Sequence, residues 1–353
     1  MNTIDEHLRQ LISRNGSDLH FIAGEPLRMR VYGDLAASDP GVLIADEVRD
    51  ALLEIMSAQA RNDFDEHDAA DFAYSLEGVA RFRVNVFRHL GGMGAVFRAI
   101  PSVAKSLDEL KMPASVANMC KHNQVMILVT GKTGSGKSTT LAAMIDDIND
   151  RVSGHILTIE DPIEFVHQRK RCLISQREVG AHTDSFSSAL HSALREDPDV
   201  ILVGELRDLE TISIAVTAAE MGILVMGTLH TNGAAATVDR IVNSFPVDKQ
   251  SHVRTMLSTS LRGVISQQLV PRAGEPGLVA ALEVLVNTPA VANLIRQGKL
   301  DQLENTMQSG RQHGMQTMDS ALKDMLDRGV IEGSVAYQAA IDKHGFEQYR
   351  EAG

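Results

Sequence analysis

The sequence predicts an α/β protein in which a small α+β domain precedes a mostly parallel sheet and a helical region follows it. Three observations support this fold class. Short apolar runs alternate with amphipathic helical segments in the middle of the chain, and a glycine-rich turn joins the first run to a helix. Alternating strands dominate the first hundred residues. These patterns divide the chain into a first domain at 1–100, a linker at 101–113, a core at 114–270 and a mostly helical region at 271–353. In the last region we expect one strand at 278–286, a helix that begins at Pro289 and a helical apolar face over 318–326.

The first hundred residues combine two helices with several strands. Apolar residues at helical spacing predict helices over 4–12 and 48–56. Apolar and charged residues alternate over 27–31, which predicts a strand, and residues 72–100 predict a meander of strands. The following linker at 101–113 is expected to contain a short helix.

Two arginines share one face of a strand in that meander. Phe82 and Val84 alternate with Arg81 and Arg83, and side chains two residues apart lie on the same face of a strand. From this pattern alone, a solvated sheet face is the better explanation, because charged side chains are mostly exposed.

A glycine-rich turn follows the apolar run at 125–129. Residues 131–138 match G-x-x-x-x-G-K-[ST] in the strand-to-helix context that a phosphate-binding loop requires. Glycines let backbone N–H groups close around phosphate oxygens, Lys137 can reach the β- and γ-phosphates, and the Ser138 hydroxyl can ligate Mg²⁺. We therefore predict an ATP or GTP site. Its contacts are expected from Thr133, Gly134, Ser135, Gly136, Lys137, Ser138 and Thr139.

Polar residues follow the next three predicted strands, at 155–159, 200–203 and 223–227. Glu164 comes after the first of them, Glu205 after the second and His230 after the third. The carboxyl ends of parallel strands meet at one edge of a sheet, where ligands bind. Glu205 ends a strand of the Walker B form, where an acidic residue can hold Mg²⁺ through water or orient the attacking water. Alone, Glu164 is explained by solvation and His230 by capping, but their shared placement favours a function.

The composition restricts the kinds of partner. The formal net charge is −12, only 4% of residues are aromatic and there is no tryptophan, which disfavours nucleic-acid binding. The two cysteines form neither a metal-type pair nor a disulfide framework, which fits a reducing cytosol. No basic signal segment and no apolar stretch of about 18 residues is visible, so membrane association is expected through partners.

Four boxes in this order resemble those of the secretion and type IV pilus ATPases. Among these, the chain is most similar to the twitching-motility retraction ATPases of the PilT group. The boxes are a Walker A box at 131–138, an Asp box at 156–165, a Walker B box at 194–207 and a His box at 227–232. Further similarity at 17–20, 78–83 and 314–317 extends the resemblance to nearly the whole chain.

The resemblance implies a cytoplasmic homohexamer with a PAS-like N-terminal domain and a RecA-like P-loop motor domain. Such a ring hydrolyses ATP with Mg²⁺ and docks at the inner membrane on the platform protein of the pilus machine. Glu164 corresponds to the family's catalytic base, Glu205 to the glutamate near Mg²⁺, and His230 to a residue that contacts the nucleotide region.

The resemblance also replaces the solvated-face explanation for the arginines. Arginines of the family's N-terminal domain that approach the phosphates correspond to Arg81, Arg83 and Arg98. A fixed guanidinium can neutralise charge on a phosphoryl group during its transfer.

We therefore predict an ATP-driven motor for pilus retraction, with one departure from the family pattern. Residues 290–297 are AVANLIRQ, whereas retraction members tend to have AIRNLIRE, a segment tied to retraction rather than to hydrolysis. This segment is closer to the accessory PilU-like group. An accessory paralogue that works beside another retraction ATPase is therefore the alternative.

Three other functions are less favoured. A nucleic-acid-translocating ATPase conflicts with the acidic charge and scarce aromatics. A non-hydrolysing regulator conflicts with the intact Lys137, Glu164, Glu205 and His230. Assembly-type ATPases of the superfamily usually carry a longer N-terminal region and a four-cysteine metal site, and this chain has two cysteines.

Overall fold

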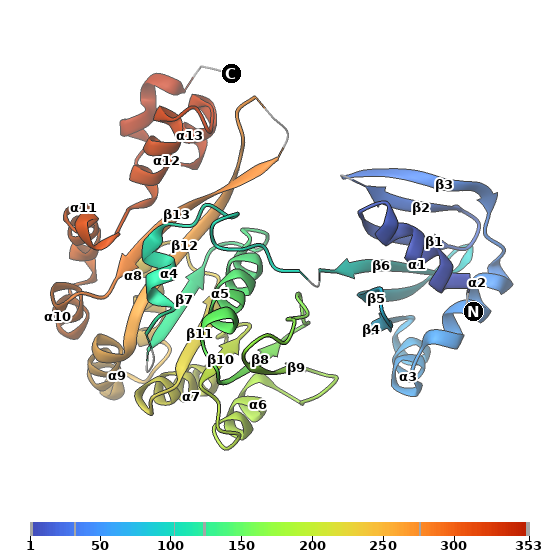
Figure 1. The fold of residues 1–353 in the computed structure, drawn as a ribbon, viewed down its shortest axis with the longest axis horizontal. Helices are drawn as coiled ribbons and strands as arrows, with labels where there is room; N and C mark the ends of the chain where they lie inside the picture. Colours follow the sequence, from blue (N-terminus) through green and yellow to red (C-terminus); the bar gives the residue numbers. More distant parts are fainter. Residues whose placement is uncertain (1–2, 32, 102, 123–124, 275–276, 351–353) are drawn as a thin grey trace. The chain divides into compact units, whose positions relative to one another are not determined.

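The computed structural model describes residues 3–31, 33–101, 103–122, 125–274 and 277–350 (Figure 1). They form two units, each with its own sheet and hydrophobic core. The first unit comprises Met1–Val103 together with Glu164–Val166, and the second comprises Ala104–Ile163 and His167–Gly353.

The first unit is an antiparallel six-stranded sheet packed against helices. Its strand order is β3-β2-β1-β6-β5-β4. The strands are β1 (Gly16–Ile22), β2 (Pro26–Val31), β3 (Asp34–Val42), β4 (Ala69–Leu76), β5 (Ala80–His89) and β6 (Gly92–Ile100). The helices are α1 (Thr3–Ser13), α2 (Ala45–Ile55) and α3 (Ala58–His67). The predicted helices and meander are confirmed, whereas β1, β3 and α3 were not predicted.

The short helix predicted within 101–113 is wrong for the described residues. Ser106 and Glu109 close a single turn, because the Ser106 N–H donates to Glu109 Oε2 at 2.7 Å and the Glu109 N–H donates to Ser106 Oγ at 3.1 Å. Lys111 then has a positive φ of 54°, which no helix continues through. Pro113 follows and disfavours helical geometry at the residue before it.

The second unit contains a seven-stranded sheet with the order β13-β12-β7-β11-β10-β8-β9. Neighbouring strands are parallel from β12 to β9, and only β13 is antiparallel to its neighbour, so the predicted mostly parallel sheet is confirmed. The strands are β7 (Met126–Thr130), β8 (His155–Glu160), β9 (Leu173–Glu178), β10 (Val200–Val203), β11 (Leu224–Leu229), β12 (Leu261–Pro271) and β13 (Leu278–Val286). Of these, β9 and β12 were not predicted.

Helices pack along this sheet and follow it to the end of the chain. They are α4 (Ala114–Met119), α5 (Lys137–Arg151), α6 (Phe186–Ala193), α7 (Leu209–Glu220), α8 (Ala234–Asn243), α9 (Val247–Ser260), α10 (Pro289–Gln297), α11 (Leu303–Ser309), α12 (Met318–Asp327) and α13 (Gly333–Ala339). Short 3₁₀ helices are η1 (Leu300–Gln302), η2 (Arg311–His313) and η3 (Lys343–Tyr349). The helix predicted to begin at Pro289 is confirmed, and the Thr288 hydroxyl caps it.

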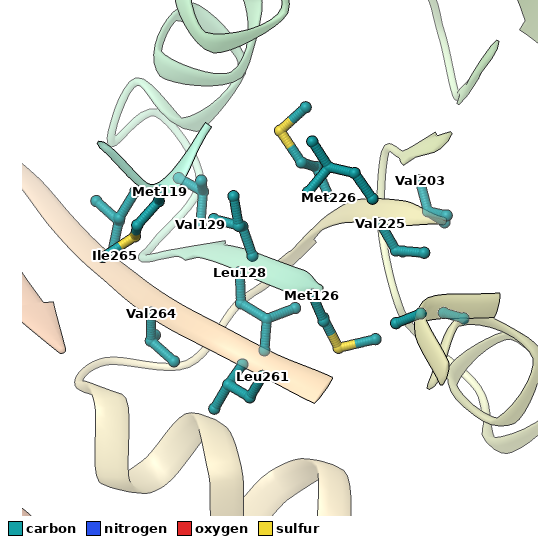
Figure 2. Packing of buried hydrophobic residues seen from close by; sticks show 14 of the residues in the cluster. Met119, Met126, Leu128, Val129, Val203, Val225, Met226, Leu261, Val264 and Ile265 are labelled. Carbon is teal, nitrogen blue, oxygen red and sulfur yellow. The ribbon is translucent and has the colours of Figure 1, made fainter. Parts of the chain in front are cut away.

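Apolar side chains cover both faces of the central strands. Every residue of β7, β10 and β11 is buried, which is why these strands are continuous apolar runs rather than alternating ones. Figure 2 shows buried side chains of β7, β11 and β12 packed on both sides of the strands, with Leu128 among them. Since interiors are close-packed, this core holds the strand ends in fixed relative positions.

A smaller apolar cluster joins the C-terminal helices to the β12–β13 pair. Leu322 and Met325 of α12 and Phe346 of η3 are buried together with Val270 of β12 and Ala281 of β13. The predicted helical face over 318–326 is therefore confirmed. The C-terminal region thus packs on the same two strands whose other residues reach the candidate site.

Truncation of Leu128 to alanine tests how far the site depends on this core. Because Leu128 is fully buried in β7, an inner strand of the sheet, we expect a loss of about 2–5 kcal/mol in the free energy of unfolding. Urea unfolding followed by circular dichroism measures it. The matched control is Leu278→Ala, since Leu278 is 58% exposed in the same unit and should lose less than about 1 kcal/mol. Equal losses in the two variants would contradict the burial assigned to β7.

Candidate nucleotide site at the carboxyl edge of the sheet

The glycine-rich loop between β7 and α5 has a shape that requires glycine. Gly131, Gly134 and Gly136 have positive φ values of 140°, 78° and 85°. A Cβ on Gly131 would lie 2.2 Å from the backbone oxygen of Gln267 and 2.7 Å from Ser135 Oγ. Substitution at Gly131 would therefore push the loop away from β12.

Lys137 turns its ammonium group back into this loop. The residue is only 9% exposed, and its Nζ donates to the carbonyl oxygens of Gly131 at 2.9 Å and Lys132 at 3.1 Å. Ser138 and Thr139 are half-buried on the first turn of α5. The structure thus places the sequence-predicted contact residues on one loop and the helix turn that follows it, with Thr133 and Gly134 exposed at the tip.

Gln267 of β12 binds the same loop through its side-chain amide, and the sequence analysis had not predicted this role. Gln267 is 3% exposed, its Nε2 donates to the Ser135 carbonyl at 2.5 Å, and its Oε1 accepts from Thr140 Oγ1 at 2.9 Å. The side-chain amide therefore ties the loop to the first turn of α5. The signal in the sequence was a pair of polar residues, 267 and 268, inside an apolar run.

Glu205 and His230 meet just beyond the ends of two adjacent strands. Glu205 follows β10 and His230 follows β11, and the structure places His230 Nε2 3.2 Å from Glu205 Oε1. The backbone holds the two loops together, since the Leu206 N–H donates to the Thr228 carbonyl at 2.9 Å. The predicted proximity of these two site residues is thereby observed.

Arg207 is a third member of this cluster, and the sequence had not assigned it a role. Its Nη2 lies 2.8 Å from Glu205 Oε2, and the Glu205 side chain is only 18% exposed. Burial alone would raise the pKa of Glu205, but the Arg207 guanidinium and the His230 ring together hold that pKa below its usual value. Glu205 is therefore a carboxylate at neutral pH. A charged carboxylate of this kind suits a hard cation such as Mg²⁺.

Glu164 belongs to a different part of the structure from the Glu205–His230 pair. The segment Glu164–Val166 is grouped with the first unit, in which the Val166 N–H donates to the Pro101 carbonyl at 3.2 Å. At the end of β8 itself lies Glu160, which is buried and accepts from Thr158 Oγ1 at 2.7 Å. The catalytic role of Glu164 stays a prediction.

The three predicted arginines all lie on the antiparallel sheet of the first unit. Arg83 of β5 and Arg98 of β6 are register partners. Arg98 Nε lies 2.8 Å from Oδ1 of the buried Asp18, whereas Arg83 Nε lies 3.6 Å from Asp71 Oδ1. Arg81 shares the face of Arg83, as predicted. Their approach to phosphates stays a prediction.

A cavity of about 440 Å³ adjoins the phosphate loop within the second unit. The loop tip lines it together with Asn232 and Gly233 of the loop that follows His230. Gln267 and Glu283 line it from β12 and β13, and Gln338 lines it from α13. The phosphate loop, the loop after His230 and the C-terminal helices therefore surround one space.

Comparison with known proteins gives full-length matches. The family model for "Type II/IV secretion system protein" matches residues 1–349. The type IV pilus retraction ATPase PilT of Pseudomonas aeruginosa is 50% identical over 337 residues, which cover 96% of this chain and 98% of that protein. The type IV pilus ATPase PilU of the same organism is 42% identical over 334 residues, covering 95% and 86%.

A solved structure extends this similarity to the fold. The crystal structure of the pilus retraction motor PilT with bound ADP matches with a TM-score of 0.91 and 43% identity, covering 98% of this chain and 99% of that one. The predicted fold class is thus confirmed. The chain therefore belongs to the type II/IV secretion system protein family and, within it, to the type IV pilus retraction ATPases.

Proposed function

We propose that this chain is an ATP-hydrolysing motor that powers the retraction of type IV pili. One observation carries the proposal. A complete phosphate loop, with the Lys137 side chain folded into it, lies on the same sheet edge as the paired Glu205 and His230. The chain that carries this site is 50% identical to a retraction ATPase. The identity of 50% to PilT against 42% to PilU favours the motor over the accessory paralogue.

Nucleotide binding exchanges the partners of Lys137. Its ammonium group is already held inside the loop by two carbonyl oxygens, so it needs only to turn to the β- and γ-phosphates. The glycines leave backbone N–H groups clear, and the N-terminus of α5 adds its positive dipole end. The loop therefore binds triphosphate with little rearrangement of its own backbone.

Hydrolysis transfers the γ-phosphoryl group of ATP to water and yields ADP and phosphate. Glu164 or Glu205 orients the attacking water and takes its proton, and His230 holds Glu205 in place from the neighbouring strand. Ser138 and Glu205 are the residues that would hold Mg²⁺, which neutralises charge on the β- and γ-phosphates. Arg81, Arg83 and Arg98 supply further positive charge from the first domain.

The working assembly we propose is a homohexamer of four-part subunits. The proposed boundaries are 1–100, 101–113, 114–270 and 271–353.

Among the described residues, none of the helices combines the length and the hydrophobicity that a membrane span requires. We propose that the ring is cytoplasmic and docks at the inner membrane on the platform protein of the pilus machine. Hydrolysis changes how the two domains of each subunit pack, and the ring passes that change on.

An accessory role beside a paralogous retraction ATPase is the second candidate function. The observation that favours it is the sequence of α10. The two departures from the retraction pattern that replace a charged residue are Ala292 and Gln297. They lie on a helix whose Arg296 donates from Nη2 to Ser258 Oγ at 3.3 Å. Gln297 is exposed and Ala292 half-buried, so both are available to a partner. These positions lie outside the phosphate loop, so this candidate also hydrolyses ATP.

Replacement of Lys137 by alanine should abolish ATP turnover. The variant loses the buried ammonium group that lies inside the phosphate loop, and we expect kcat to fall by at least about 100-fold. A phosphate-release assay on purified protein measures it. Lys132→Ala is the control, since the Lys132 side chain is exposed at the loop tip and should keep most of the activity. Near-normal hydrolysis by the Lys137 variant would refute the assignment.

The ion pair to Arg207 should set the acid limit of ATP turnover. Arg207→Ala removes a group that keeps the pKa of Glu205 low, so Glu205 becomes protonated at higher pH as the medium is acidified. We expect the acid limb of kcat/KM to move to higher pH, while Arg207→Lys, which keeps a positive charge, moves it less. Identical acid limbs in wild type and both variants would show that Glu205 does not govern the rate.

Retraction itself is tested in cells. Labelled pili are imaged in a host that lacks its retraction ATPase and is complemented with wild type, Glu205→Ala or the control Glu210→Ala, in which an exposed glutamate is changed. We expect retraction with wild type and with the control but not with Glu205→Ala. If wild type fails to restore retraction although the purified protein hydrolyses ATP, the accessory role replaces the motor.

A further inference from the structure

Glu283 is a buried carboxylate that the proposed chemistry does not use. It lies in β13, whose sequence LVAALEVLV is otherwise apolar, and it is only 5% exposed. Burial raises its pKa, and the nearby acidic residues Glu304 and Asp319 act in the same direction. A carboxyl group in such surroundings is costly to the fold unless it is well hydrogen-bonded, so its contacts define its role.

Its two oxygens accept hydrogen bonds from the first residues of two helices. The Ala234 N–H at the start of α8 donates to Oε1 at 2.7 Å, and the Met318 N–H at the start of α12 donates to Oε2 at 3.4 Å. The first N–H groups of a helix have no partner within the helix, and the helix N-terminus favours negative charge. The Glu283 side chain thus caps the N-termini of both helices.

The first of these helices begins immediately after the loop that carries His230. Three residues separate His230 from Ala234, and the last of them, Gly233, donates its N–H to Ser266 Oγ at 2.9 Å. Ser266 of β12 is the register partner of Glu283 in β13. One rung of the β12–β13 pair therefore holds the end of the His230 loop at two successive backbone N–H groups.

The second helix, α12, belongs to the C-terminal cluster on β12 and β13. Its start is also fixed independently of Glu283, because Gln316 and Val284 exchange backbone hydrogen bonds at 2.9 and 3.0 Å. Loss of the Glu283 carboxylate would therefore leave α12 beside β13 but remove its link to α8.

We propose that Glu283 is a positioning residue that couples the His230 loop to the C-terminal helices. It acts through the loop and not on the nucleotide, so it sets the catalytic rate more than nucleotide affinity. The coupling makes the position of α12 and the geometry around Glu205 and His230 interdependent. This inference rests on the proposed ATPase function for its kinetic readout alone.

The kinetic test compares Glu283→Gln with a matched control in the same region. Glutamine keeps one acceptor oxygen but turns an NH₂ group toward the other helix N–H. We expect kcat for ATP to fall about tenfold while KM changes less than about twofold. The control is Asp319→Asn, because the Asp319 carboxylate accepts hydrogen bonds from the N–H groups of Ile341 and Asp342, at 2.7 and 2.8 Å, on the C-terminal side. It should keep the wild-type kcat.

Hydrogen exchange of the full-length protein provides a readout that needs no hydrolysis. In Glu283→Gln we expect faster amide exchange both at 234–238 and at 318–322, whereas Asp319→Asn should speed exchange only on the C-terminal side. Ser266→Ala, a milder change in the same rung, should speed exchange at 234–238 and lower kcat. These three results together would support the coupling.

Two outcomes would overturn the inference. An unchanged kcat in Glu283→Gln, or faster exchange at 318–322 alone, would show that Glu283 merely supports the C-terminal helices. If wild type itself does not hydrolyse ATP, the proposed function fails. The hydrogen-exchange results at 234–238 and 318–322 then test the coupling on their own.

Discussion

Burial of the Lys137 ammonium inside its own loop is the interaction on which the site depends. A charged group that is 9% exposed needs acceptors, and the carbonyl oxygens of Gly131 and Lys132 supply them. The loop can fold that far back only because Gly131 lies against the Gln267 backbone where no side chain would fit. The same contact fixes the loop to β12, and the buried core of the sheet fixes β12 relative to β7. Packing far from the phosphates thus determines where they can bind.

The β12–β13 pair connects the parts of the second unit. Gln267 holds the phosphate loop, the Ser266–Glu283 rung holds the loop after His230, and Val270 and Ala281 carry the C-terminal helices. A shift of these two strands would therefore move the phosphate loop, the loop after His230 and the C-terminal helices together. This arrangement suits a motor, in which hydrolysis at one site must move distant surfaces.

The sequence predicted the parts of the site that depend on local pattern. The phosphate loop is a contiguous motif, and β7, β10 and β11 are apolar runs long enough to recognise. The roles of Gln267 and Glu283 could not be predicted, because each is a polar residue within an otherwise apolar strand and no local motif marks it. The residue that Gln267 binds, Ser135, is 132 residues away in the sequence. The linker helix was predicted wrongly because Ser106 and Glu109 form a capping pattern that closes one turn and goes no further. Glu164 could not be placed by pattern because its segment is grouped with the first unit.

The central claim is that ATP binds by taking Lys137 from its own loop while Glu205 stays paired with His230. The most direct measurement is a crystal structure of the protein with Mg²⁺ and a non-hydrolysable ATP analogue. The claim predicts that Lys137 Nζ leaves the carbonyl oxygens of Gly131 and Lys132 for the β- and γ-phosphate oxygens, with Ser138 and Glu205 on the metal side. A triphosphate bound elsewhere, or bound with Lys137 still on both carbonyl oxygens, would contradict it.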